Sequence, residues 1–501
     1  MFSCLKSAWS DKKFLKEVFK LMIPGVLQGF FIALGNLIVI FILGIITKDN
    51  ATEIVAAVSL SAQLFSLCLF VVTGISVVGN IFAGQFIGQK NMDMVQQTTR
   101  WKVIMCVGVS FIFIILICAI SPPRILSFLD GGGSGQTNTA LLNKYGAQYT
   151  WISLPTYFLI AIIIPFIYTL NVNKKAHIAL IFSTIAIFID LICDVLLGIC
   201  ATNSIVPATM GKLNIDTAQA MAIGTNMGRI TEFMIYVVYF LIKKPEYLFG
   251  KKWCYVSDYI WRKCCKTAAL LVPGELLYQV YVIIQSIIIG HIGGDPGSRT
   301  DKNQTAVNLA GVNVVLTIME LFWSILQGFY IVVPIFISQY LGTDQIKKAK
   351  DNAKKIVGIS IVLSFILGLV VISLSFWVPD IVFSNLDKNA KIIAKYYLIG
   401  VGINAMLYML SFQIIVILRA GPGQLLPTLS DQLPFYLFWL PMLVILLLYT
   451  NLEVKWIMII VCSTGIFQIT TATLLFKYSN WAQNITNINM KNEKKKNIIN
   501  N

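Results

Sequence analysis

The sequence contains twelve apolar runs, each long enough to cross a lipid bilayer. They cover residues 21–46, 54–86, 102–121, 147–170, 176–200, 217–242, 268–291, 306–338, 356–378, 395–418, 425–449 and 454–476. A helix needs about 20 apolar residues to span the hydrocarbon core. Only 12% of the residues are charged and 57% are hydrophobic, which leaves too little polar surface for a water-soluble fold. We therefore predict an all-α integral membrane protein of about twelve transmembrane helices.

Lysine and arginine are distributed unequally between the two sets of loops. The set that includes both chain ends holds 28 of the 39 basic residues, and the opposite set holds 10. Because basic loops stay on the cytoplasmic side, we expect both termini in the cytoplasm of a multi-pass protein of the cell (plasma) membrane. This alternation also explains the net charge of +16 without a nucleic-acid partner.

The two halves of the sequence repeat each other. Pro24-Gly25 corresponds to Pro273-Gly274 at an offset of 249, and Gln85 and Gly88 correspond to Gln339 and Gly342 after a short insertion. Six spans per repeat give both copies the same orientation, so we predict two lobes related by a pseudo-two-fold axis along the membrane normal.

The predicted organisation has five parts. They are a cytoplasmic N-terminal segment (1–20), an N-lobe (21–242), a cytoplasmic linker (243–267), a C-lobe (268–476) and a cytoplasmic tail (477–501) that we expect to be disordered.

The order of several short motifs resembles the multidrug and toxic compound extrusion (MATE) family. The motifs are Pro24-Gly25-Val26-Leu27-Gln28, Gly44, Ala56-Ala57-Val58-Ser59-Leu60, Gly74, Gly79, Gln85 to Gly88, their counterparts Gln327-Gly328 and Gln339 to Gly342, and Leu418-Arg419-Ala420-Gly421 with Pro427, Asp431 and Pro441. The resemblance implies twelve helices in a V-shaped pair of lobes and antiport of Na+ or H+ against drug-like, often cationic compounds. Val39 stands where members usually carry an aspartate.

Asp190 and Asp194 are the strongest candidates for a coupling site. They are four residues apart and therefore lie on one face of the fifth predicted helix. Two carboxylates this close at low dielectric do not both ionise cheaply unless a cation lies between them. Since hard cations such as Na+ take oxygen ligands, we predict that Asn36, Thr225 and Asn226 complete a transient cation site. A structural hydrogen-bond network is the alternative.

The other acidic residues in the spans suggest contacts with cargo. Arg229 and Glu232 are three residues apart and are predicted to pair with each other. An acidic group at bilayer depth is costly, which makes it a functional candidate. We predict a substrate site for cationic, aromatic compounds from Glu275, Glu320 and Asp431 with Trp323, Phe329 and Tyr436, although aromatic clusters also serve as packing.

These observations predict a secondary active antiporter that exports small cationic or amphipathic organic molecules. A lipid-linked sugar flippase of the same superfamily and a channel or sensory membrane protein are the alternatives. The sequence contains no P-loop and no nucleophile–base set, so an enzyme is not expected. We expect no cofactor besides the coupling Na+ or H+, no structural metal, and a monomer. The natural substrate and the choice of ion stay open.

Overall fold

The structure is a computed structural model that describes residues 2–46, 51–129, 139–202, 216–248, 255–381 and 387–486. The helices of the first half are α1 (Phe2–Ser10), α2 (Lys12–Ile46), α3 (Ala51–Gly88), α4 (Met92–Ile120), α5 (Pro122–Leu129), α6 (Thr139–Val172), α7 (Ala176–Thr202) and α8 (Thr217–Lys243). The described part contains no β-strand.

The second half repeats this arrangement. Its helices are α9 (Asp258–Ile292), α10 (Lys302–Val333), η1 (Pro334–Ser338), α11 (Gln339–Gly342), α12 (Ile346–Leu374), α13 (Val378–Ile381), α14 (Lys388–Arg419), α15 (Leu425–Pro434), η2 (Phe435–Trp439), α16 (Leu440–Tyr449), α17 (Val454–Cys462) and α18 (Gly465–Tyr478). The π-helical turns η1 and η2 continue the helices before them, and η1 begins at Pro334.

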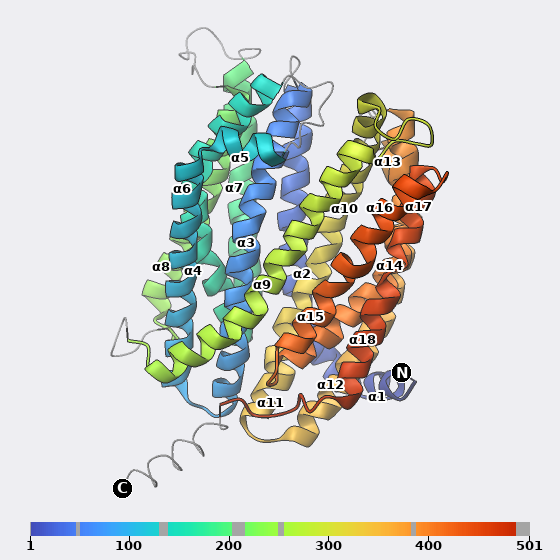
Figure 1. Cartoon of the computed structure of the whole chain (residues 1–501). Helices are drawn as coiled ribbons and strands as arrows, with labels where there is room; N and C mark the ends of the chain where they lie inside the picture. Colours follow the sequence, from blue (N-terminus) through green and yellow to red (C-terminus); the bar gives the residue numbers. More distant parts are fainter. Residues whose placement is uncertain are drawn as a thin grey trace.

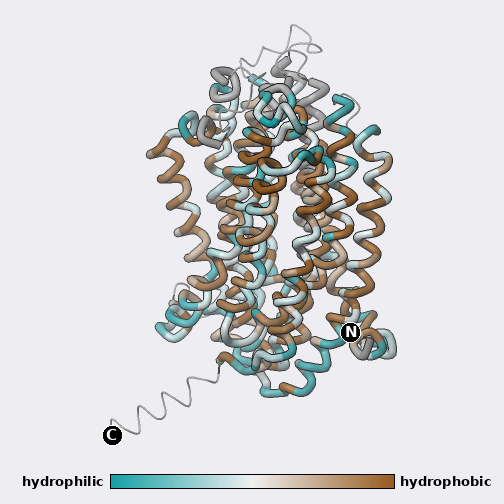
Figure 2. The backbone as a smooth tube through the Cα atoms, turned by 45° about the vertical axis from the view of Figure 1, so that its right-hand side comes forward, coloured by the Kyte–Doolittle hydropathy of each residue, from teal (hydrophilic) through white to brown (hydrophobic). Residues whose placement is uncertain are grey.

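All twelve predicted spans coincide with helices or with helices in direct succession. Eleven of the described segments are long and apolar enough to cross a membrane. The remaining span, 217–242, lies in α8, which is less apolar because it carries Asn226, Arg229 and Glu232. Large side chains such as Ile115 and Phe188, each 63% exposed, cover the outside of the bundle. Figure 2 shows hydrophobic residues along the helices and hydrophilic ones gathered at the helix ends, as a lipid environment requires.

Several helices begin earlier than the apolar runs suggest. For example, α4 starts at Met92, where the Asn91 side chain accepts a hydrogen bond from the Met94 N–H at 3.3 Å. Similarly, α9 starts at Asp258, so the last residues of the predicted linker 243–267 belong to a helix. Amphipathic ends extend a transmembrane helix beyond the bilayer, and apolarity alone does not reveal them.

The helices form two bundles. Figure 1 shows α4, α6, α7 and α8 on one side and α14, α16, α17 and α18 on the other, with α2, α3, α9 and α10 between them. The ends of the described chain, α1 and residues 479–486, lie on the same side of the bundle (Figure 1), which we call the terminal side.

The repeated glycine motifs bring the lobes together on the terminal side. A side chain at Gly88 would meet the Gln339 carbonyl, and one at Gly342 would meet the Gln85 carbonyl. These two contacts exchange repeat-related residues, as the predicted pseudo-two-fold axis requires. We call the contact between residues 74–88 and 328–342 the seam. The backbones approach closely here because glycine has no side chain.

The tail is ordered further than predicted. Residues 477–486 do not form a disordered extension, because α18 continues to Tyr478 and the side chains of Trp481 and Ile485 are then buried. The rest of the predicted tail, 487–501, lies outside the described residues.

Candidate coupling and substrate sites

The predicted acidic pair lies between α7 and α8. Gly224 and Gly228 of α8 face Asp194 and Asp190, and a side chain at either glycine would collide with the acidic residue opposite. Asp194 is fully buried, and neither of its carboxylate oxygens has a hydrogen-bond partner among the described residues. One carboxylate oxygen of Asp190 likewise has no hydrogen-bond partner among the described residues. Because a buried charge needs a partner, this pair has unused capacity to bind a proton or a cation.

The predicted oxygen ligands are placed unequally around this pair. Thr225 interacts with the hydroxyl of Tyr149, a residue of α6 close to both carboxylates. Asn226 instead uses its amide on α6, accepting a hydrogen bond from Thr156 at 2.7 Å and donating one to the Ile152 carbonyl at 2.6 Å. The side chain of Asn36 lies outside the described part of the structure. Tyr149 is the neighbour that sequence reasoning missed.

The predicted pairing of Arg229 with Glu232 is confirmed, at 2.8 Å. The other Glu232 oxygen accepts a hydrogen bond from Ser183 of α7 at 2.7 Å, and Ser183 accepts one from Gln28 of α2 at 2.8 Å. These hydrogen bonds link three helices of the N-lobe, α2, α7 and α8. Arg229 thus forms its ion pair with Glu232, and among the described residues no ion pair is formed by Asp190 or Asp194.

Two of the predicted cargo carboxylates are instead paired within the protein. Arg419, at the end of α14, donates to Glu275 of α9 at 2.9 Å and to Asp431 of α15 at 3.1 Å. All three side chains are at least nine-tenths buried. In this conformation Glu275 and Asp431 are held by Arg419, and their predicted contact with cargo stays a prediction.

Glu320 has a different environment. Ser324, one turn further along α10, lies against Gly29 of α2 across the two lobes. Glu320 is on the same face of α10, yet its side chain is exposed. Glu320 therefore lies at the surface of the described structure, one turn along α10 from a contact between the lobes.

The predicted aromatic residues do not form one surface. Phe329 is completely buried in the hydrophobic core, so its ring cannot stack on cargo in this conformation. Tyr436 is partly exposed and donates its hydroxyl hydrogen bond to the Leu277 carbonyl at 2.6 Å. The side chain of Trp323 lies outside the described part.

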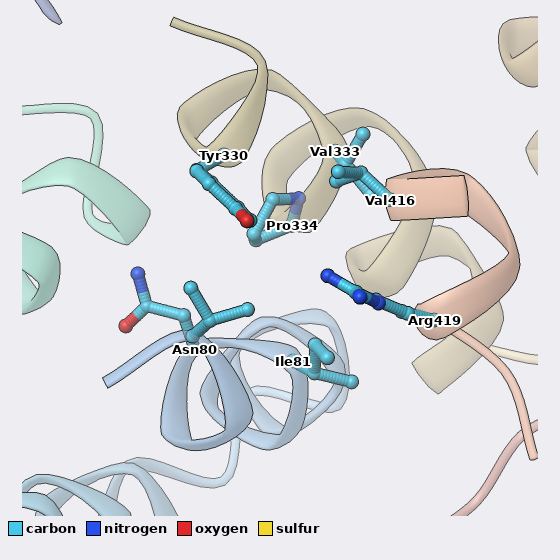
Figure 3. A pocket seen from close by; sticks show the side chains of 8 residues that line it. Asn80, Ile81, Tyr330, Val333, Pro334, Val416 and Arg419 are labelled. Atoms are coloured by element: carbon cyan, nitrogen blue, oxygen red, sulfur yellow. The ribbon is translucent and has the colours of Figure 1, made fainter. Parts of the chain in front are cut away.

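A small cavity lies between the lobes beside the seam. Its volume is about 10 Å³, room for roughly one water molecule. Figure 3 shows Asn80 and Ile81 of α3 on one side, with Tyr330, Val333, Pro334, Val416 and Arg419 of the C-lobe around the rest. Organic cargo does not fit here, and the close backbone contacts of the seam keep the lobes together on the terminal side.

Asn80 also contacts a buried lysine. Lys102 of α4 is fully buried and donates to the Asn80 side chain at 2.9 Å and to the Thr169 hydroxyl at 2.8 Å. Its aliphatic chain fills the space that the missing side chain of Gly79 leaves. Both Lys102 and Arg419 fall at the ends of apolar runs, where sequence reasoning counted them as loop charges. One signal in the sequence could have revealed the burial of Arg419: Glu275 and Asp431 fall within apolar spans and need a cationic partner there.

A known protein family matches most of this sequence. The family model described as MatE matches residues 24–196 and 271–428. The chain belongs to the MatE family. It is therefore a MATE family transporter, as the motif order predicted, and transporters rather than enzymes make up the family.

Solved structures of MATE transporters share the fold. A eukaryotic MATE transporter, AtDTX14, is 14% identical with a TM-score of 0.72, over 94% of this chain and 97% of that one. A mutant of the MATE transporter VcmN of Vibrio cholerae is 11% identical with a TM-score of 0.73, over 95% and 99%. A MOP superfamily transporter of Pyrococcus furiosus, described by a reversed polarity of its binding pocket, is 14% identical with a TM-score of 0.70, over 92% and 94%. No curated protein sequence matches the chain.

Proposed function

We propose that this MATE transporter is a secondary antiporter that exports small cationic or amphipathic organic compounds in exchange for Na+ or H+. The observation that carries the proposal is the pair Asp190 and Asp194, in which Asp194 is fully buried and three buried carboxylate oxygens have no hydrogen-bond partner among the described residues. Glu275 and Asp431, in contrast, each form an ion pair with Arg419.

The pair has the physical properties that coupling requires. Two adjacent buried carboxylates repel each other, so a cation or a proton must join them for the closed bundle to be stable. When the site gains access to water on the other side of the membrane, hydration replaces that partner and the ion leaves. The side chains of Asp190 and Asp194 would move against Gly228 and Gly224 of α8 when the ion binds or leaves.

The cargo part of the proposal rests on Glu320. Its carboxylate is exposed one turn along α10 from Ser324, which lies against Gly29 of α2, so it would add negative charge next to this contact between the lobes. A cationic compound would gain Coulomb attraction there, in surroundings of lower dielectric than water. With both termini cytoplasmic, the protein would export the compound across the cell membrane, and one chain would be sufficient for transport.

The test is transport by the purified protein in liposomes. Efflux of the fluorescent cation ethidium is measured under a Na+ gradient and under a pH gradient, for the wild type and for Asp190→Asn, Asp194→Asn and Glu320→Gln. Glu246→Gln is the matched control, because Glu246 is exposed and lies in a loop. We expect both aspartate variants to lose gradient-driven efflux, and Glu320→Gln to raise the ethidium concentration needed for half-maximal rate.

The outcomes separate the parts of the proposal. The gradient that drives wild-type efflux identifies the ion. Gradient-driven efflux that survives in Asp194→Asn refutes coupling at the pair. If folded wild-type protein moves no cation under either gradient, the exporter is refuted and a lipid-linked sugar flippase becomes the better hypothesis.

A further inference from the structure

The chain crosses both lobes once more after its last transmembrane helix. Figure 1 shows this segment, in dark red, running from the foot of α18 along the terminal side toward α3. We call Ser479–Thr486 the C-terminal strap. Its side chains of Trp481, Asn484, Ile485 and Thr486 are between 3% and 7% exposed, although the segment has no helix or strand.

The strap is hydrogen-bonded to the end of α3 in the N-lobe. The Ile485 N–H donates to the Gln85 side chain at 3.0 Å, and the Gln89 amide donates to the Thr486 hydroxyl at 2.6 Å. These glutamines also reach the C-lobe directly. Gln85 donates to the Ala420 carbonyl at 3.2 Å and Gln89 to the Gly342 carbonyl at 3.1 Å.

The strap is equally attached to the C-lobe. The Asn484 amide donates to the Gly342 carbonyl and to the Asp344 carboxylate, both at 3.1 Å. Tyr259, at the start of α9 in the segment that links the lobes, donates to the Thr486 carbonyl at 2.8 Å. The backbone at Trp481 lies so close to Gly421 that a side chain there would collide with it.

We propose that the C-terminal strap holds the terminal side of the transporter closed and must leave its seat when that side opens. Gln85 and Gln89 belong to one lobe, while Gly342 and Asp344 belong to the other. When the lobes separate at the seam, no position of the strap keeps both sets of hydrogen bonds. The strap therefore stabilises the conformation seen here, in which the terminal side is closed, and lowers the population of the conformation in which that side is open. The inference uses the two-lobe transport cycle and is independent of the coupling ion.

Hydrogen exchange of the full chain tests the proposal without cargo. Amide exchange is followed in peptides covering 80–90 and 334–344 for the wild type, Asn484→Ala and Ile485→Pro, which lacks the donor to Gln85. Gln483→Ala is the control, because its side chain bonds only within the strap. We expect seam exchange to rise by about fivefold or more in the two strap variants and to stay unchanged in the control. Unchanged exchange in both folded strap variants overturns the proposal.

A crosslink supplies the opposite perturbation. Gln89→Cys with Thr486→Cys, joined by a short thiol-cleavable crosslinker, fixes the strap to α3. We expect cargo movement to fall at least tenfold and to return after cleavage by reductant. Transport at the wild-type rate with the crosslink complete shows that the strap need not leave, and refutes the inference. Because seam exchange is read without cargo, failure of the exporter proposal does not affect this result.

Discussion

Replacing Arg419 by methionine should destabilise the protein severely, and replacing its two partners as well should restore it. Arg419 is the only described cation in contact with Glu275 and Asp431. Its loss leaves two largely buried carboxylates without their ion-pair partner. Removing one member of a buried ion pair costs about 3–5 kcal/mol, whereas replacing the whole set by apolar residues of similar volume is often neutral.

A loss of stability of this size can be measured as a change in melting temperature. A loss of about 3–5 kcal/mol lowers the apparent melting temperature by roughly 6–10 °C at about 2 °C per kcal/mol. Melting is followed in detergent by size-exclusion fluorescence after heating. Arg419→Met is compared with the triple variant Arg419→Met/Glu275→Leu/Asp431→Leu and with Arg262→Met, an exposed position on α9. We expect the single variant to melt far below the triple one and the control to match the wild type. Equal melting of the single and triple variants would contradict the ion-pair argument.

Two further predictions follow from individual contacts. Gly224→Val should abolish gradient-driven efflux, because the new side chain collides with the Asp194 carboxylate; retained coupling in folded protein would show that the α7–α8 contact does not hold the ion. The hydrogen bond from Lys355 lowers the pKa of Asp11, so its contribution to docking α1 is present at neutral pH and is lost as the pH falls below about 4. Hydrogen exchange of α1 should therefore rise on acidification in the wild type and less so in Asp11→Asn, and equal acid responses would refute the assignment.

The N-lobe candidate site could be read largely from the sequence. A spacing of four places Asp190 and Asp194 on one helical face whatever surrounds them, and a spacing of three brings Arg229 to Glu232. These relations are local, since they depend only on the geometry of one helix. The partner groups were less predictable: Asn226 faces α6 and Tyr149 lies near the pair, because side-chain direction depends on how three helices pack.

The C-lobe cluster shows where local reasoning fails. Arg419 lies 144 residues from Glu275 in sequence, and its position at the end of an apolar run is equally typical of a loop charge. The fold alone brings α9, α14 and α15 together. The same holds for Lys102, whose burial depends on α4 beginning at Met92 and on the space at Gly79.

The sequence by itself determined the membrane environment, the twelve helices, the duplication and the family, because hydropathy and repeats are written along the chain. The tertiary structure decided which charges are neutralised, which side is closed and where the strap lies. Those properties depend on contacts between residues such as Gln85 and Ile485, 400 positions apart. In a bundle of similar apolar helices, no periodicity specifies such pairs, and only the packed arrangement determines which buried groups are satisfied.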